Sequence, residues 1–129
     1  MSIQLTEKVI NGKKIRTNNQ RTNEIATLWS EVPTMQLQGE LFAVYSNYTS
    51  NHTEDYDLLV GNEQAKFEEA IIIKAGDYLK IPVSDPTPAG VAQAWQTIWS
   101  DVAVEQKRTY QTDFEHYRED GTIVIYLSI

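Results

Sequence analysis

Thr27-Leu-Trp-Ser-Glu-Val32 returns seventy residues later in the chain as Thr97-Ile-Trp-Ser-Asp-Val102. Each copy belongs to a stripe of apolar residues at positions i, i+3, i+4 and i+7, which is typical of an amphipathic helix. The first stripe is Ile25, Leu28, Trp29 and Val32, and the second is Trp95, Ile98, Trp99 and Val102. Two matching helices at one offset indicate an internal duplication.

Segments rich in β-branched and aromatic residues surround both helices and are separated by turn signals. The predicted strands are 41–48, 56–60 (ended by Gly61-Asn62), 70–74, 78–83, 110–117 and 122–129. Segment 3–17 contains Asn11-Gly12 and is interpreted as a small hairpin or a bent strand. Thr87 is expected to cap the second helix, with Pro88 at its first position.

Each half of the chain therefore has the same order of strand, helix, strand and strand. A second match, at an offset of 69, aligns Tyr45-Ser-Asn-Tyr48 with Phe114-Glu-His-Tyr117 and makes Ser46 the counterpart of Glu115. Two such units predict an α+β fold, an antiparallel sheet with both main helices on one side and a pseudo-two-fold axis. A ligand cleft is expected between the two units. With 129 residues, the chain 1–129 is interpreted as a single domain.

Composition and charge exclude several classes of function. Lys and Arg number 11 against 18 Asp and Glu, so the net charge of −7 argues against direct nucleic-acid binding and against an anionic membrane surface. A negative field instead attracts cationic ligands. The chain has no cysteine, no apolar run long enough to span a membrane and no apolar signal core. We therefore expect a cytoplasmic protein.

Catalytic and metal-binding motifs are not found in the sequence. There is no phosphate-binding glycine loop, no zinc-protease motif and no nucleophile elbow. Only His52 and His116 are available as imidazole ligands, and a polar cluster around His52 (Glu54, Asp55 and Asp57) is best interpreted as a solvated hairpin tip. We predict no catalytic residues, no cofactor and no metal site.

The most informative position is Glu115. Because side chains alternate along a strand, Glu115 shares a face with Asp113 and Tyr117, and the adjacent His116 points the other way. Spacing alone favours an exposed position on an open sheet face over the anchor of a pocket. A buried carboxylate would need a partner.

The aromatic residues are the other candidates for a ligand site. Trp29 and Trp99 match in the repeat and are expected to pack in the core. Trp95 replaces Ile25 of the other copy, so core packing and a ligand platform are equally supported. The strand tyrosines, whose hydroxyl groups need a partner when they are buried, are Tyr45, Tyr48, Tyr78 and Tyr117.

Several motifs, in this order along the chain, are similar to a known family. They are Arg16-Thr-Asn-Asn19, Ala43-Val-Tyr-Ser-Asn-Tyr48, Asp55-Tyr-Asp-Leu-Leu-Val-Gly61, Gly76-Asp-Tyr78, Ala94-Trp-Gln-Thr-Ile-Trp99 and Asp113-Phe-Glu-His-Tyr117. The chain resembles the effector-binding domains of AraC-type transcription activators and the GyrI-like small-molecule-binding proteins. It looks most like the free-standing effector-binding proteins of bacterial integron cassettes.

This resemblance implies a duplicated strand–helix–strand–strand fold that binds amphipathic, often cationic, aromatic compounds around a buried glutamate. By motif position that glutamate is Glu115, which reverses the expectation from spacing alone. The ligand-binding residues that we expect are Glu115, Trp95, Tyr48, Tyr45, Tyr78 and Tyr117. Activators of this family also carry a helix-turn-helix domain, for which this chain has no room, so a sensing or sequestering role is expected, with a possible homodimer or a separate regulator as partner.

Two other functions remain open at this stage. The chain also resembles GyrI-like proteins that hydrolyse electrophilic genotoxins, in which Glu115 would activate water while Tyr48 or Tyr117 donates a proton. Alternatively, it is an interaction protein that inhibits a larger enzyme. A ligand-binding domain with broad specificity for cationic aromatic compounds is the leading hypothesis, and an enzyme is the less favoured one.

Overall fold

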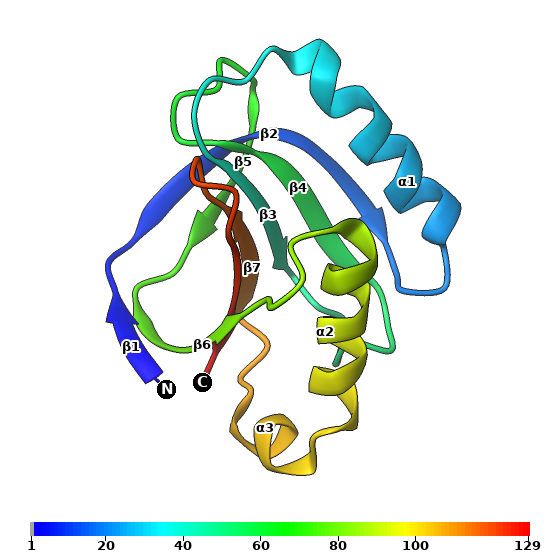
Figure 1. The fold of residues 1–129 in the computed structure, drawn as a ribbon, viewed down its shortest axis with the longest axis vertical. Coiled ribbons are helices and arrows are strands. Elements are labelled where there is room, and N and C mark those ends of the chain that lie inside the picture. The colour runs from blue at the N-terminus through cyan, green and yellow to red at the C-terminus, as the bar shows by residue number, and fades with distance from the viewer. Residues whose placement is uncertain (1) are drawn as a thin grey trace.

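Eight strands and three α-helices make up the computed structural model, which describes residues 2–129 (Figure 1). The strands are β1 (Ser2–Leu5), β2 (Lys8–Thr17), β3 (Leu41–Ser46), β4 (Tyr56–Asn62), β5 (Glu69–Ile73), β6 (Gly76–Pro82), β7 (Thr112–Tyr117) and β8 (Ile123–Ser128). The helices are α1 (Thr22–Glu31), which continues into a short 3₁₀ helix (Val32–Met35), α2 (Pro88–Ser100) and α3 (Val102–Lys107). The predicted α+β architecture is confirmed.

All eight strands form one curled sheet in the order β1-β6-β8-β7-β3-β4-β2-β5, and every neighbouring pair is antiparallel. This order is symmetric. Read from the other edge, it is the same order with β1 exchanged for β5, β2 for β6, β3 for β7 and β4 for β8. The repeat therefore includes one more strand than the sequence indicated. Strand β1 of the first half pairs with β6 of the second, and β5 of the second half pairs with β2 of the first, so each half completes the sheet edge of the other.

The sheet separates two hydrophobic regions. On its inner face, one cluster of buried residues from seven strands includes Ile10, Val44, Leu59 and Phe114. Helices α1 and α2 both cover the other face (Figure 1). The expected placement of both helices on one side is confirmed.

Equivalent residues of the repeated helix motif pack in equivalent ways in α1 and α2. Leu28 of α1 and Ile98 of α2 are each 3% exposed and face the sheet, whereas Trp29 and Trp99 are only partly buried. Thr87 caps α2 by accepting a hydrogen bond from the Gly90 amide at 3.1 Å, as predicted. Helix α2 ends at Ser100, however, because the Asp101 side chain caps α3 instead. Val102, expected on the apolar stripe, is therefore 70% exposed.

Asn11-Gly12 does not form a turn but lies inside β2, so segment 3–17 is not a hairpin: β1 and β2 follow each other and pair with different strands. Gly12 is directly opposite Gly61 of β4. A Cβ atom on Gly12 would lie 2.0 Å from the Val60 carbonyl oxygen, and one on Gly61 would lie 1.8 Å from the Asn11 carbonyl oxygen. Both glycines permit a close approach of two backbones, which also explains why Gly61 does not end its strand.

The second sequence match, at an offset of 69, is wrong. Tyr45 lies on the helix-covered face, whereas Phe114 belongs to the cluster on the inner face. A two-fold axis perpendicular to the sheet relates residues that point to the same face. Because side chains alternate between the faces along a strand, the residue numbers of equivalent positions in β3 and β7 must differ by an even number. Tyr45 therefore shares its face with Glu115, and Ser46 is not the counterpart of Glu115.

Candidate functional site: an aromatic cleft around Glu115

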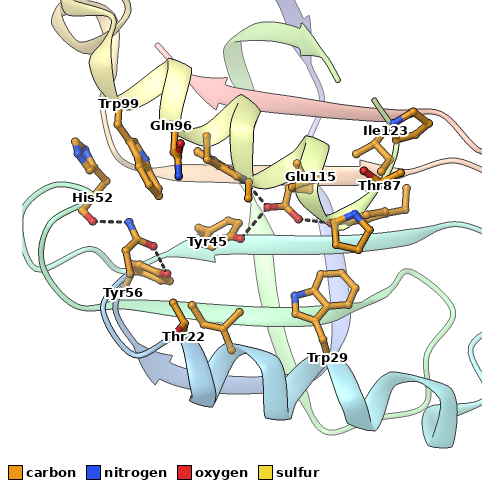
Figure 2. A pocket seen from close by; sticks show the side chains of 18 of the residues that line it. Thr22, Trp29, Tyr45, His52, Tyr56, Thr87, Gln96, Trp99, Glu115 and Ile123 are labelled. Carbon is orange, nitrogen blue, oxygen red and sulfur yellow. Dashed lines mark hydrogen bonds between the residues drawn. The ribbon is translucent and has the colours of Figure 1, made fainter. Parts of the chain in front are cut away.

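A cleft of about 730 Å³ opens between α1 and α2, above the central strands of the sheet (Figure 2). This volume lies within the usual range for small-molecule pockets, about 300–1,000 Å³. Its walls come from both halves of the repeat, with Trp29 on α1, Trp95 and Trp99 on α2, and Tyr45 and Tyr117 on the two central strands. The predicted cleft between the duplicated units is therefore present.

The aromatic rings in the cleft support one another edge to face. Trp29 contacts Tyr117 with ring centroids 5.3 Å apart, and Trp95 contacts Tyr45 at 5.4 Å; the two interplanar angles are 67° and 66°. The first contact joins a helix of the first half to a strand of the second half. The second contact joins a helix of the second half to a strand of the first half. Such packing holds the rings as fixed flat walls.

Glu115 lies on the floor of the cleft and is only 3% exposed (Figure 2). Its Oε2 atom accepts hydrogen bonds from the Tyr45 hydroxyl at 2.8 Å and from Trp95 Nε1 at 2.6 Å. Its Oε1 atom accepts one from the Tyr117 hydroxyl at 2.5 Å. All three donors are neutral, so hydrogen bonds hold the carboxylate in place without neutralising its charge.

The electrostatics of Glu115 follow from this environment. No Lys, Arg or His side chain in residues 2–129 lies within ion-pair distance of its carboxylate. Burial raises the pKa of Glu115, and the three hydrogen bonds offset only part of that rise. Burial and the nearby carboxylate also raise the pKa of Tyr45 and of Tyr117 far above 10, so both hydroxyls stay protonated.

A second buried carboxylate, Asp113, shows the contrast. The Arg108 guanidinium donates to it at 2.7 Å, the Tyr48 hydroxyl at 2.6 Å and the Ser128 amide at 2.9 Å. Asp113 thus has a cation as partner, and Glu115 two residues later has none. Sequence reasoning placed Asp113 on the same face but assigned it no role, because Arg108 lies in a connecting segment with no recognisable pattern.

Five of the six predicted ligand-binding residues line the cleft: Glu115, Trp95, Tyr45, Tyr48 and Tyr117. Tyr78 does not. It is buried on the inner face of the sheet, where its hydroxyl donates to the Lys74 carbonyl oxygen and lies 2.6 Å from the Thr112 hydroxyl. Tyr78 is a core residue because the register of β6 points it away from the helices.

Two tryptophans expected in the core also line the cleft. Trp29 and Trp99 are partly buried and face the space between the helices. The i+4 member of each stripe lies at the border of the packed face, and position in the repeat does not distinguish core from rim.

Sequence reasoning also missed His52. The 51–55 turn does form a tip, but it folds over the cleft, so that His52 stacks on Trp99 with ring centroids 5.4 Å apart and an interplanar angle of 4°. Its neighbours are used elsewhere, since Asp55 accepts from Asn18 and Asp57 from Arg16. Within residues 2–129, no three His, Asp or Glu side chains gather where they could hold a metal ion.

An apolar cleft with flat aromatic walls and one unneutralised carboxylate matches a particular ligand chemistry. Aromatic faces attract cations through their quadrupoles, and a desolvated carboxylate attracts them more strongly still. An anionic group would be repelled by both the aromatic faces and the carboxylate.

Among residues 2–129, no helix is long and apolar enough to cross a membrane.

Comparison with known proteins agrees with the fold. The model of the Cass2 family, described as integron-associated effector binding protein, matches residues 3–129. An integron cassette protein from the mobile metagenome of Vibrio cholerae has a similar structure, with a TM-score of 0.84 and 22% identity over 99% of this chain and 94% of that one. A second similar structure is SAV2435 bound to tetraphenylphosphonium, with a TM-score of 0.77 and 16% identity over 98% of this chain and 91% of that one. No curated protein matches this chain in sequence.

Proposed function

The chain belongs to the family of integron-associated effector-binding proteins, and we propose that its cleft binds cationic amphipathic aromatic compounds of varied structure. The observation that carries this proposal is Glu115, a buried carboxylate held by three neutral donors and without a basic partner. A ligand cation would supply the missing charge. SAV2435, whose structure is similar to that of this chain, is bound to the cation tetraphenylphosphonium.

The chemistry of the walls supports broad specificity. A cation between Trp95, Tyr45 and Tyr117 would gain cation–π attraction, which strengthens as the ligand displaces water from the aromatic faces. Flat rings and a single charge impose few directional requirements, so ligands of different shape can satisfy them. The net charge of −7 would raise the local concentration of cations around the chain.

The protonation states favour binding over hydrolysis. A hydrolytic role for Glu115 would require a neighbouring acid, yet the tyrosine hydroxyls beside it have a pKa raised far above neutrality. Both oxygens of Glu115 are also already engaged. We therefore propose that the protein senses or sequesters its ligands, and that any downstream response depends on a partner.

The test compares two ions of equal size and opposite charge. Tetraphenylphosphonium should quench the tryptophan fluorescence of the protein with a Kd of roughly 1 μM, equivalent to about −8 kcal/mol. Tetraphenylborate, which presents the same four phenyl rings around a negative centre, should bind at least roughly 100-fold more weakly, since it meets an unpaired carboxylate. Equal affinity for the two ions would show that only apolar burial drives binding, and the proposal would fail.

A further inference from the structure

At the end of the cleft beyond Trp95, two side chains carry N–H groups that have no acceptor. Trp99 Nε1, Arg108 Nε and Arg108 Nη1 are shielded from solvent and have no hydrogen-bond partner among residues 2–129. A buried donor of this kind has lost its hydrogen bonds to water without gaining a protein acceptor, which costs free energy unless another group accepts its hydrogen bond. Both side chains line the cleft.

Arg108 is held so that one edge of its guanidinium stays free. Nη2 donates to Asp113 at 2.7 Å, and the guanidinium plane lies over the Tyr110 ring with its Cζ 4.1 Å from the ring centroid. Its side chain is only 1% exposed. The nearest other carboxylate oxygen, on Glu105, is 4.0 Å from Nη1 and already accepts the Tyr110 hydroxyl.

The side chains with unpaired donors lie next to the groups that surround Glu115: the Trp99 ring centroid is 6.2 Å from that of Trp95, and Arg108 binds Asp113. Trp95 and Trp99 are separated by four residues of one helix, a rise of about 6 Å. Glu115 and Asp113, the anchor of Arg108, are separated by two residues of one strand, about 6.6 Å. Figure 2 shows the same arrangement, with Trp99 and His52 toward one end of the cleft and Glu115 farther along.

We infer that Trp99 and Arg108 form a second polar subsite, which takes a neutral hydrogen-bond acceptor such as a carbonyl or ether oxygen of the ligand. This inference rests on the proposed function and narrows it to cationic aromatic compounds that also carry an acceptor, displaced from the charge by about the 6.2 Å that separates the Trp95 and Trp99 ring centroids. A neutral acceptor fits better than an anion, because Asp113 already neutralises Arg108 and Glu105 lies close by.

His52 is the group that such a ligand would displace. Its ring covers the face of Trp99 and is held by that stack and by Nδ1, which lies 3.0 Å from the Tyr110 hydroxyl and 3.8 Å from Glu105 Oε1. Burial lowers the pKa of His52, so the ring is neutral at pH 7 and adds no charge to the subsite. An aromatic ligand ring can take its place on Trp99 while the ligand oxygen reaches the indole N–H.

The test uses two cations that differ only at the acceptor. One is N-methylquinolinium with an acetyl group on the ring remote from nitrogen, and the other carries an isopropenyl group of the same shape in that place. The wild-type protein should bind the acetyl cation about tenfold more tightly. Trp99→Phe, which keeps a ring without the N–H, should lower this preference to about threefold or less, and Arg108→Lys should lower it as well.

Two matched variants separate the subsite from the rest of the cleft. Trp29→Phe, at the equivalent position of α1, should leave the tenfold preference unchanged. Glu115→Gln should weaken both cations equally and also keep the preference. If both cations bind the wild-type protein equally, or if the preference survives in both Trp99→Phe and Arg108→Lys, the subsite is disproved while cation binding stands. If neither cation binds, the proposed function itself fails, and the subsite fails with it.

Discussion

Trp95 and Tyr45 donate to the same oxygen of Glu115, one from a helix of the second half of the chain and the other from a strand of the first. The two rings also touch each other edge to face. Oxygen Oε2 thus joins the two copies of the repeat at the floor of the cleft. This arrangement holds a negative charge in the cleft between the two copies of the repeat, and several measurable consequences depend on it.

Binding of a cation should depend on pH through Glu115. Because the pKa of this carboxyl is raised above its ordinary value of 4.5, the ligand should bind tightly above the raised pKa and weakly as pH falls through it. A bound cation favours the charged form, so binding should release protons when the pH lies near that pKa. Titrations with tetraphenylphosphonium at a series of pH values would measure both effects, and a flat pH profile would contradict the assignment.

The same group should make the unliganded protein less stable as pH rises. A carboxyl whose pKa is higher in the folded state binds more protons folded than unfolded between the two pKa values, so stability is lost as pH increases from about 4.5 through the raised pKa. Glu115→Gln should remove this loss. Urea unfolding of both proteins across this range is the measurement, and a steeper loss in the variant would oppose the account.

Trp95→Phe should be costly because it removes a donor from a buried charge. We expect a loss of about 1.5–3 kcal/mol in the free energy of unfolding, the range for a hydrogen bond to a charged group. Trp29→Phe is the matched control, since the Trp29 ring packs on Tyr117 without donating to Glu115; it should cost less than about 1.5 kcal/mol. Denaturant unfolding followed by circular dichroism compares the two, and equal losses would argue against a structural role for the Trp95 N–H.

The duplicated helices should respond alike to truncation of their buried residues. Leu28→Ala and Ile98→Ala remove side chains that are packed against the sheet and should each cost about 2–5 kcal/mol. Trp29→Ala and Trp99→Ala remove partly buried rings and should cost less stability but more ligand affinity. The unfolding curves and titrations of all four variants test this division, which would be wrong if the tryptophan variants were the less stable pair.

Gly12→Ala should disrupt the pairing of β2 with β4. Its added Cβ would lie 2.0 Å from the Val60 carbonyl oxygen, so the two backbones must separate. A destabilisation larger than the roughly 1 kcal/mol typical of a point substitution is expected. Lys14→Ala, two residues along the same strand, is the control and should change stability by about 0.5 kcal/mol at most. A fully stable Gly12→Ala protein would show that the close approach is not required.

The sequence carried enough information to predict the helices and their common side of the sheet. The 3.6-residue periodicity around Leu28 and Ile98 is long and regular, and its repetition implied the two-fold arrangement. Strands were harder, because a short apolar run does not specify which face its side chains occupy. This is why Tyr78, a strand tyrosine like Tyr45, was expected in the cleft but lies in the core.

The site itself was predictable only in part. Position in the family motif identified Glu115, whereas spacing alone favoured an exposed residue, since burial depends on helices that pack from distant parts of the chain. Arg108 and His52 come from connecting segments without periodicity, and only the folded chain brings them against Asp113 and Trp99. Long-range contacts of this kind leave no local signal.

The central claim is that Glu115 binds its ligand through charge, and one comparison tests it most directly. Isothermal titration of tetraphenylphosphonium into the wild-type protein and into Glu115→Gln measures the loss when the charge alone is removed, since glutamine can still bond to Tyr45, Trp95 and Tyr117. We predict a loss on the order of 1–3 kcal/mol, or about 5-fold to 150-fold in Kd, with no loss of stability. Equal affinity of the two proteins for the cation would contradict the claim.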